Sequence, residues 1–179
     1  SISYTVKDGF LTYTAPDLTD AVYPVTIDPT LSLSIATGAN DYYHDGFSFF
    51  GTDTTLRIGK VGPSAYQHAG LWFDGITIQS GSTINSATVD FRTDAGDTYL
   101  AGGLGTKIYA VDEDDAAAAT NNATCNTDDG IRTTANVSWN SWGSDTNNTL
   151  KTSPDFSTVV QEIVDRAGWA SGNALLIQP

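Results

Sequence analysis

Short stretches in which apolar and polar residues alternate recur along the chain and predict β-strands. In the stretch 86–92, Ala87, Val89 and Phe91 alternate with polar residues, so that one face of a strand would be apolar. Similar stretches, bounded by Gly, Asp, Asn and Ser, occur at 10–14, 22–27, 31–36, 55–58, 68–73, 107–111, 137–139 and 174–177. Eight or nine short strands at this spacing predict an all-β fold, a two-sheet sandwich of jelly-roll type.

One stretch near the C-terminus has helical spacing instead. Its apolar residues recur three and four positions apart, at Phe156, Val159, Val160, Ile163 and Val164. Ser153 is placed to cap such a helix, Pro154 suits its first turn, and Gly168 suits a left-handed residue after its end. The sequence therefore predicts one amphipathic helix within 153–166.

The stretch 112–151 shows little periodicity, and we expect it to form long loops.

The composition is that of one globular domain with an additional arm. The chain has 179 residues, of which 40% are hydrophobic, and a single Cys, which excludes an intrachain disulfide. A chain of this length buries enough surface to fold without cross-links. Its apolar runs are only a few residues long, so we expect no insertion into a membrane.

The charge balance narrows the classes of partner. The chain has 21 acidic and 8 basic residues, which gives a formal net charge of −13. Such a surface repels nucleic acid and anionic membranes. Divalent cations, neutral sugars and other proteins, including copies of the same chain, remain as partners.

Several features favour an extracellular protein. The sequence begins at Ser1 and contains no Met, from which we expect a product cut from a larger precursor. Three N-x-[ST] sequons, at Asn122, Asn136 and Asn147, lie in one Asn/Thr-rich stretch and are candidate glycosylation sites. We therefore expect an extracellular or cell-surface location, and a virion surface fits equally well.

Several segments resemble one family. The segments 69–74 (AGLWFD) and 81–89 (GSTINSATV) resemble the A-x-L-R-F-D … G-A-x-I-x-S-A-x-L pattern of DNRLRE-type domains. The segments 23–29 (YPVTIDP) and 168–174 (GWASGNA) are similar to the boundary and the G-W-x-x-G-N turn of the same group. The resemblance spans about residues 23–179 and implies a carbohydrate-binding-module-like β-sandwich of large secreted and cell-surface proteins. Trp72 stands where the family usually has Arg.

Compared with that family, the sandwich is one strand short at its C-terminus and carries a surplus arm at its N-terminus. We predict an extended arm at residues 1–22 and the sandwich domain at 23–179. An unpaired sheet edge binds an extended peptide by strand pairing. The arm would pair either with its own domain or with a neighbour, and the second arrangement grows a filament. The favoured function is a non-enzymatic structural or adhesive module that assembles with copies of itself.

A carbohydrate-binding module is the second hypothesis. Aromatic side chains offer flat faces on which sugar rings stack. The candidates, in two loop-like stretches, are Tyr42, Tyr43, Trp139 and Trp142. The alternative for each is packing in the core.

The Asp-rich composition also suggests a calcium site. Ca²⁺ takes six to eight oxygen ligands, which neighbouring carboxylates and loop carbonyls can supply. The densest acidic cluster is Asp112, Glu113, Asp114 and Asp115. A solvated acidic loop is the alternative, and the pairs Asp128–Asp129 and Asp45–Gly46 fit turns better than ligand sets.

Catalytic signals are weak. Only His44 and His68 can act as imidazole bases, no G-x-S-x-G elbow occurs, and Cys125 has no adjacent base. His44 fits a loop residue or a metal ligand better than a catalyst. We expect no enzyme, and a polysaccharide-cleaving enzyme with paired carboxylates is the distant third hypothesis.

Overall fold

A computed structural model of the chain describes residues 3–7, 10–14, 30–35, 37–61, 65–94, 105–140 and 148–179. The chain divides into two compact units, Ser1–Ser32 and Leu33–Pro179. The boundary expected at residue 22 falls inside the first unit.

The first unit contains a two-stranded sheet. β1 (Ser3–Lys7) and β2 (Phe10–Thr14) are antiparallel, with Ser3 opposite Thr14. The strand predicted at 10–14 is confirmed, and its partner is the strand that precedes it in the arm. The strand predicted at 22–27 lies outside the described residues. The described residues 31–35 form no strand, contrary to the prediction.

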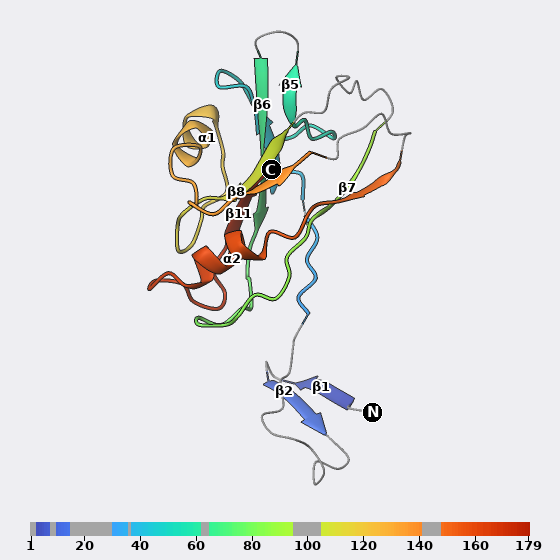
Figure 1. The fold of residues 1–179 in the computed structure, drawn as a ribbon, viewed down its shortest axis with the longest axis vertical. Coiled ribbons are helices and arrows are strands. Elements are labelled where there is room, and N and C mark those ends of the chain that lie inside the picture. The colour runs from blue at the N-terminus through green and yellow to red at the C-terminus, as the bar shows by residue number, and fades with distance from the viewer. Residues whose placement is uncertain are drawn as a thin grey trace. The chain divides into compact units, whose positions relative to one another are not determined.

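The second unit is built on a seven-stranded antiparallel sheet with the order β4, β3, β6, β11, β8, β9, in which β5 also pairs with β6. Its strands are β3 (Asp41–His44), β4 (Phe49–Phe50), β5 (Gly59–Val61), β6 (Ala65–Phe73), β8 (Thr106–Ala110), β9 (Val137–Trp139) and β11 (Leu175–Gln178). β6 is the longest strand, and both β3 and β11 pair with it (Figure 1).

Four of the predicted strands are confirmed in this sheet, and one is not. The stretches 68–73, 107–111, 137–139 and 174–177 correspond to β6, β8, β9 and β11. The stretch 55–58 forms no strand, because pairing with β6 begins only at Gly59. β3 and β4, in contrast, fall where the sequence suggested an aromatic loop.

A separate two-stranded sheet pairs β7 (Asp90–Arg92) with β10 (Leu150–Thr152). The strand predicted over 86–92 is therefore shorter than expected. Before Asp90 the pairing is mixed. The amides of Val89 and Ala87 donate to Oγ of Ser153 and Oδ1 of Asp155, while their carbonyls accept from the backbone amides of Ser153 and Phe156.

Helix α2 (Ser157–Val164) confirms the predicted helix. The residues that begin and end this helix differ from those predicted. Phe156 is the N-cap residue and makes no side-chain cap bond, while the Ser153 hydroxyl bonds to residues outside the helix. The left-handed glycine is not Gly168 but Gly172 (φ 104°), in the turn before β11.

Helix α1 (Asn122–Asp128) lies in the stretch for which the sequence predicted loops. Asn121 caps it, because its side chain accepts a hydrogen bond from the Thr124 amide at 3.0 Å. The helix has only seven residues, of which Cys125 and Asp128 are buried. So short an element carries too little periodicity to be recognised in the sequence.

The large sheet is covered on both faces, as alternation along β11 shows. Leu175 and Ile177 belong to one core cluster and Leu176 belongs to the other. The first cluster includes the apolar stripe of α2, and we refer to this side as the α2 face. The second includes Cys125 of α1, and we refer to that side as the α1 face.

These elements make the chain mainly β, with antiparallel sheets and two helices among the described residues. The jelly-roll arrangement stays a prediction. Neither helix in the described part of the chain has the length and apolarity that a membrane span requires.

Candidate functional site

Polar side chains line up on the α1 face of the large sheet. Four adjacent strands contribute one residue each: His44 on β3, His68 on β6, Gln178 on β11 and Tyr109 on β8. His44 is the register partner of His68, and Gln178 is the partner of Tyr109. Pairing across strands therefore brings the two histidines together, although they are far apart in sequence.

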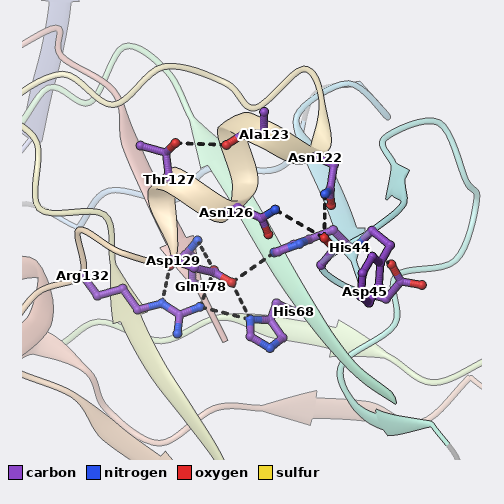
Figure 2. Close-up of polar contacts among 12 residues, drawn as sticks. His44, Asp45, His68, Asn122, Ala123, Asn126, Thr127, Asp129, Arg132 and Gln178 are labelled. Atoms are coloured by element: carbon purple, nitrogen blue, oxygen red, sulfur yellow. Dashed lines mark hydrogen bonds and ion pairs between the residues drawn. The ribbon is translucent and has the colours of Figure 1, made fainter. Parts of the chain in front are cut away.

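Asp129, at the C-terminal end of α1, joins these side chains. Its Oδ2 lies 2.7 Å from Nδ1 of His68 and 3.3 Å from Nε2 of His44. Its Oδ1 accepts hydrogen bonds from Nη2 of Arg132 at 2.5 Å and from Nε2 of Gln178 at 3.2 Å. Figure 2 shows these side chains converging on the one carboxylate. Asp129 is therefore the centre of the network.

The turn between β3 and β4 holds α1 in position above the sheet. Oδ1 of Asp45 accepts hydrogen bonds from the amides of Phe47 and Ser48, which closes the turn predicted there. The exposed carbonyl of Gly46 accepts hydrogen bonds from the side chains of Asn122 and Asn126 at 2.8 and 3.4 Å (Figure 2). These bonds fix the helix whose end presents Asp129 to the histidines.

The two adjacent carboxyls at the end of α1 have opposite pKa shifts. Burial opposes ionisation of Asp129, but the contacts with His44 and His68 and the charge of Arg132 outweigh it, so its pKa is well below the usual value. Burial raises the pKa of Asp128 to about 6, with further contributions from the charges of Glu113 and Asp129. Asp129 is therefore the carboxylate of this site that is ionised at all ordinary pH values.

Several buried polar atoms on this face make no hydrogen bond. His44 is 1% exposed, and neither of its ring nitrogens has a hydrogen-bond partner, since the contact with Asp129 is not aligned as a hydrogen bond. Oδ2 of Asp128 is also buried without a partner. Leaving such an atom unpaired costs about 1–3 kcal/mol. A ligand that satisfies these atoms gains that energy.

A groove of about 240 Å³ lies beside this network. His68, Arg132 and Gln178 belong to both the network and the groove lining. The other polar and aromatic lining residues are Tyr66, Gln67, Thr106, Lys107 and Tyr109. The Arg132 guanidinium lies 5.3 Å from the centroid of the Tyr109 ring. No acidic residue is among the described residues that line the groove.

The predicted calcium ligands are Asp112, Glu113, Asp114 and Asp115. Arg166 bonds to two of them, with Nη1 on Oδ1 of Asp112 and Nε 2.6 Å from Oδ1 of Asp114. Oδ1 of Asp115 accepts a hydrogen bond from the Ala174 amide at 2.7 Å. These carboxylates tie the segment after β8 to the turn that follows α2. A calcium site there stays a prediction.

The predicted sugar-stacking residues were Tyr42, Tyr43, Trp139 and Trp142. Tyr42, Tyr43 and Trp139 are 3%, 2% and 1% exposed, so their rings are core packing and offer no free face to a sugar. Trp142 lies outside the described residues. In the described part of the chain, the aromatic residues with large exposure are Phe47 and Tyr66.

The three sequons differ in their surroundings. Nδ2 of Asn122 donates to the Gly46 carbonyl, so attachment of a glycan there would break the bond that holds α1. Asn136 is exposed and donates to the Thr134 carbonyl at 3.1 Å. Asn147 lies outside the described residues. Glycosylation stays a prediction at each position.

Cys125 is a free, fully buried thiol whose pKa burial raises to about 12. This agrees with the absence of a reactive-cysteine signal in the sequence.

The sequence named His44 and His68 as isolated bases but did not pair them, and it missed Arg132 and Gln178 entirely. One available signal was that the chain has only two histidines, each in or beside a strand-like stretch. The pairing itself depends on strand register, which no local pattern shows.

Comparison with protein-family models, curated proteins and solved structures found no match to this chain. The resemblance to DNRLRE-type domains therefore stays a prediction.

Proposed function

We propose that this chain is a non-enzymatic binding module that recognises a saccharide in the groove beside His68. The lining of the groove carries the proposal: it combines the exposed aromatic residue Tyr66 with the cationic side chains of Lys107 and Arg132. A ligand site typically pairs aromatic surface with a few placed polar groups in this way.

The size of the groove fits one unit of a longer sugar chain. Its volume of about 240 Å³ is below the roughly 300–1,000 Å³ of pockets that enclose a whole ligand. Tyr66 is 57% exposed, and aromatic rings are the surfaces on which sugars stack. The neighbouring units would then remain in solvent.

The charge of the groove favours a sugar that carries a carboxylate. The chain has a net charge of −13, yet the described lining of the groove includes Lys107 and Arg132 and no acid. Arg132 is ion-paired with Asp129 behind the lining, so the preference depends chiefly on Lys107. Charged donors make stronger hydrogen bonds to a carboxylate than to a hydroxyl. At physiological ionic strength the Debye length is about 8 Å, so distant acidic residues repel such a sugar weakly.

Calorimetric titration with matched oligosaccharides tests the proposal. In buffer with EDTA and near-physiological salt, we expect an oligogalacturonate to bind more tightly than an oligoglucose of equal length. Tyr66→Ala should weaken the binding of both about tenfold, which corresponds to loss of about 1.4 kcal/mol. Lys107→Met should remove the preference for the acidic sugar and leave the neutral one unchanged.

Phe47→Ala is the matched control, because Phe47 is 92% exposed and lies in the turn between β3 and β4, outside the groove. Binding that Phe47→Ala abolishes and Tyr66→Ala leaves intact would move the sugar site to that turn. Failure of both oligosaccharides to bind would refute the proposal.

An extracellular location and self-association through the N-terminal arm, residues 1–22, remain predictions from the sequence. Light scattering of the purified chain measures the second directly, since strand exchange with a neighbour requires a species larger than one chain.

A further inference from the structure

We propose that His44, His68 and Asp129 form a binding site for one divalent transition-metal ion. The three candidate ligand atoms are Nε2, Nδ1 and Oδ2 respectively, and all lie within 4.8 Å of one another. Both histidines of the chain are used, and both approach the same carboxylate oxygen. This inference does not depend on sugar binding, although His68 also lines the groove.

The distances are close to those of a tetrahedral site. Zinc bonds of about 2.0–2.2 Å to nitrogen and oxygen separate neighbouring ligand atoms by roughly 3.3–3.5 Å. The separation of Nε2 of His44 from Oδ2 of Asp129 is 3.3 Å. The separation of Nδ1 of His68 from Oδ2 is 2.7 Å, so this side chain must withdraw by well under 1 Å. The His68 side chain is 41% exposed, which leaves it room to do so.

The burial of His44 points to a ligand independently. Its ring is almost wholly inaccessible, yet neither nitrogen is hydrogen-bonded. A buried polar group is nearly always satisfied by some partner. An ion between the two imidazoles would bind the Nε2 lone pair and offset the cost of burying it.

The surroundings of Asp129 resemble the outer sphere of a metal site. Arg132 and Gln178 both donate to Oδ1, which orients the carboxylate with Oδ2 towards the histidines (Figure 2). Outer-sphere hydrogen bonds of this kind hold metal ligands in place. The Arg132 cation, whose Nη2 lies 3.4 Å from Nδ1 of His68, opposes the charge of an ion, whereas the carboxyl of Asp128, which interacts with His44, favours it.

The ligand atoms select the class of metal. Two imidazole nitrogens and one carboxylate oxygen suit zinc and its neighbours in the first transition row, whereas calcium requires six or more oxygens. Three protein ligands leave coordination positions for water or another ligand. The site is therefore distinct from the calcium site predicted at Asp112–Asp115.

Titration of the metal-free full-length chain with Zn²⁺ tests the site. We expect one ion per chain, a rise in melting temperature, and, with Co²⁺ as probe, the visible absorption of a tetrahedral ion. His68→Gln should weaken zinc binding by more than the roughly 10–100-fold that loss of an outer-sphere partner costs. His68 is the preferred position because its partial exposure makes the variant compatible with folding, which circular dichroism checks.

Asp165→Asn is the control for Asp129→Asn, since it removes the same charge from the exposed C-cap residue of α2. It should leave zinc affinity unchanged, while Asp129→Asn lowers it at least tenfold. NMR of the wild-type chain gives a second readout, because the imidazole signals of both histidines must shift on addition of Zn²⁺. The site is overturned by zinc binding that His68→Gln leaves intact, by equal affinity for Ca²⁺, or by unshifted imidazole signals.

Discussion

The two faces of the large sheet are made by alternate residues of the same strands, yet they are stabilised in different ways. On the α2 face, Ile108, Ile163 and Ile177 are at most 1% exposed and belong to the hydrophobic cluster that includes α2. On the α1 face, the buried residues include His44 and Gln178. Apolar packing is stable wherever shapes fit, whereas buried polar groups require specific partners. The candidate site lies on the α1 face, where polar groups are buried at an energetic cost.

From this comparison we expect the α2 face to contribute more to the free energy of unfolding than the α1 face. Ile163→Ala leaves a cavity under α2, and we expect it to lower the free energy of unfolding by about 2–5 kcal/mol. Thr158→Ala, at an exposed position of the same helix, should change it by no more than about 0.5 kcal/mol. Urea denaturation measures both. Equal effects of the two changes would show that the α2 face is not the main source of stability.

On the α1 face, we expect partners to be strongly coupled. Asp129→Ala leaves Arg132 and the two histidines without their carboxylate and should cost about 2–3 kcal/mol. The double variant Asp129→Ala/Arg132→Ala should cost less than the sum of the single changes, by about 1 kcal/mol or more. Urea denaturation in the presence of EDTA measures this double-mutant cycle without a contribution from metal binding. Additive single effects would mean that the network is not cooperative.

The two faces also differ in how their contribution to the free energy of unfolding depends on pH, and this effect is smaller. The pKa of Asp128 rises from 3.8 to about 6 in the folded chain, so its neutral form favours folding. This contribution is complete below pH 3.8 and is lost as the pH rises through about 6. Asp128→Asn should therefore gain about 2 kcal/mol over the wild-type chain between pH 4 and pH 7. Ile163→Ala should show no such change, and a pH-independent difference for Asp128→Asn would contradict the raised pKa.

Much of the fold was contained in local patterns. Alternation found β6, β8, β9 and β11, and helical spacing found α2, because the side chains of a strand or an amphipathic helix face the core at a regular spacing along the chain. The pattern failed at α1, whose seven residues bury only Cys125 and Asp128. It also failed at the ends of elements, where Ser153 bonds to the β7 segment instead of capping α2.

The candidate site was predicted less well. The sequence marked His44 as a loop residue or metal ligand and placed Asp129 in a turn, and both residues lie in the site. It also listed Tyr42, Tyr43 and Trp139 as candidates for sugar stacking with core packing as the alternative, and the structure buries all three. A buried and an exposed aromatic residue look alike in sequence. Neither Tyr66 nor Arg132 carried any signal.

By itself, then, the sequence determined the class of the fold, its main strands and one helix, since each follows from residues that are neighbours along the chain. Only the tertiary structure decided that His44 faces His68 and that the end of α1 brings Asp129 to both of them. Strand register and the docking of a short helix are sums of many weak contacts between distant segments. A local sequence pattern does not report contacts between distant segments. The site could therefore be recognised only from the folded structure.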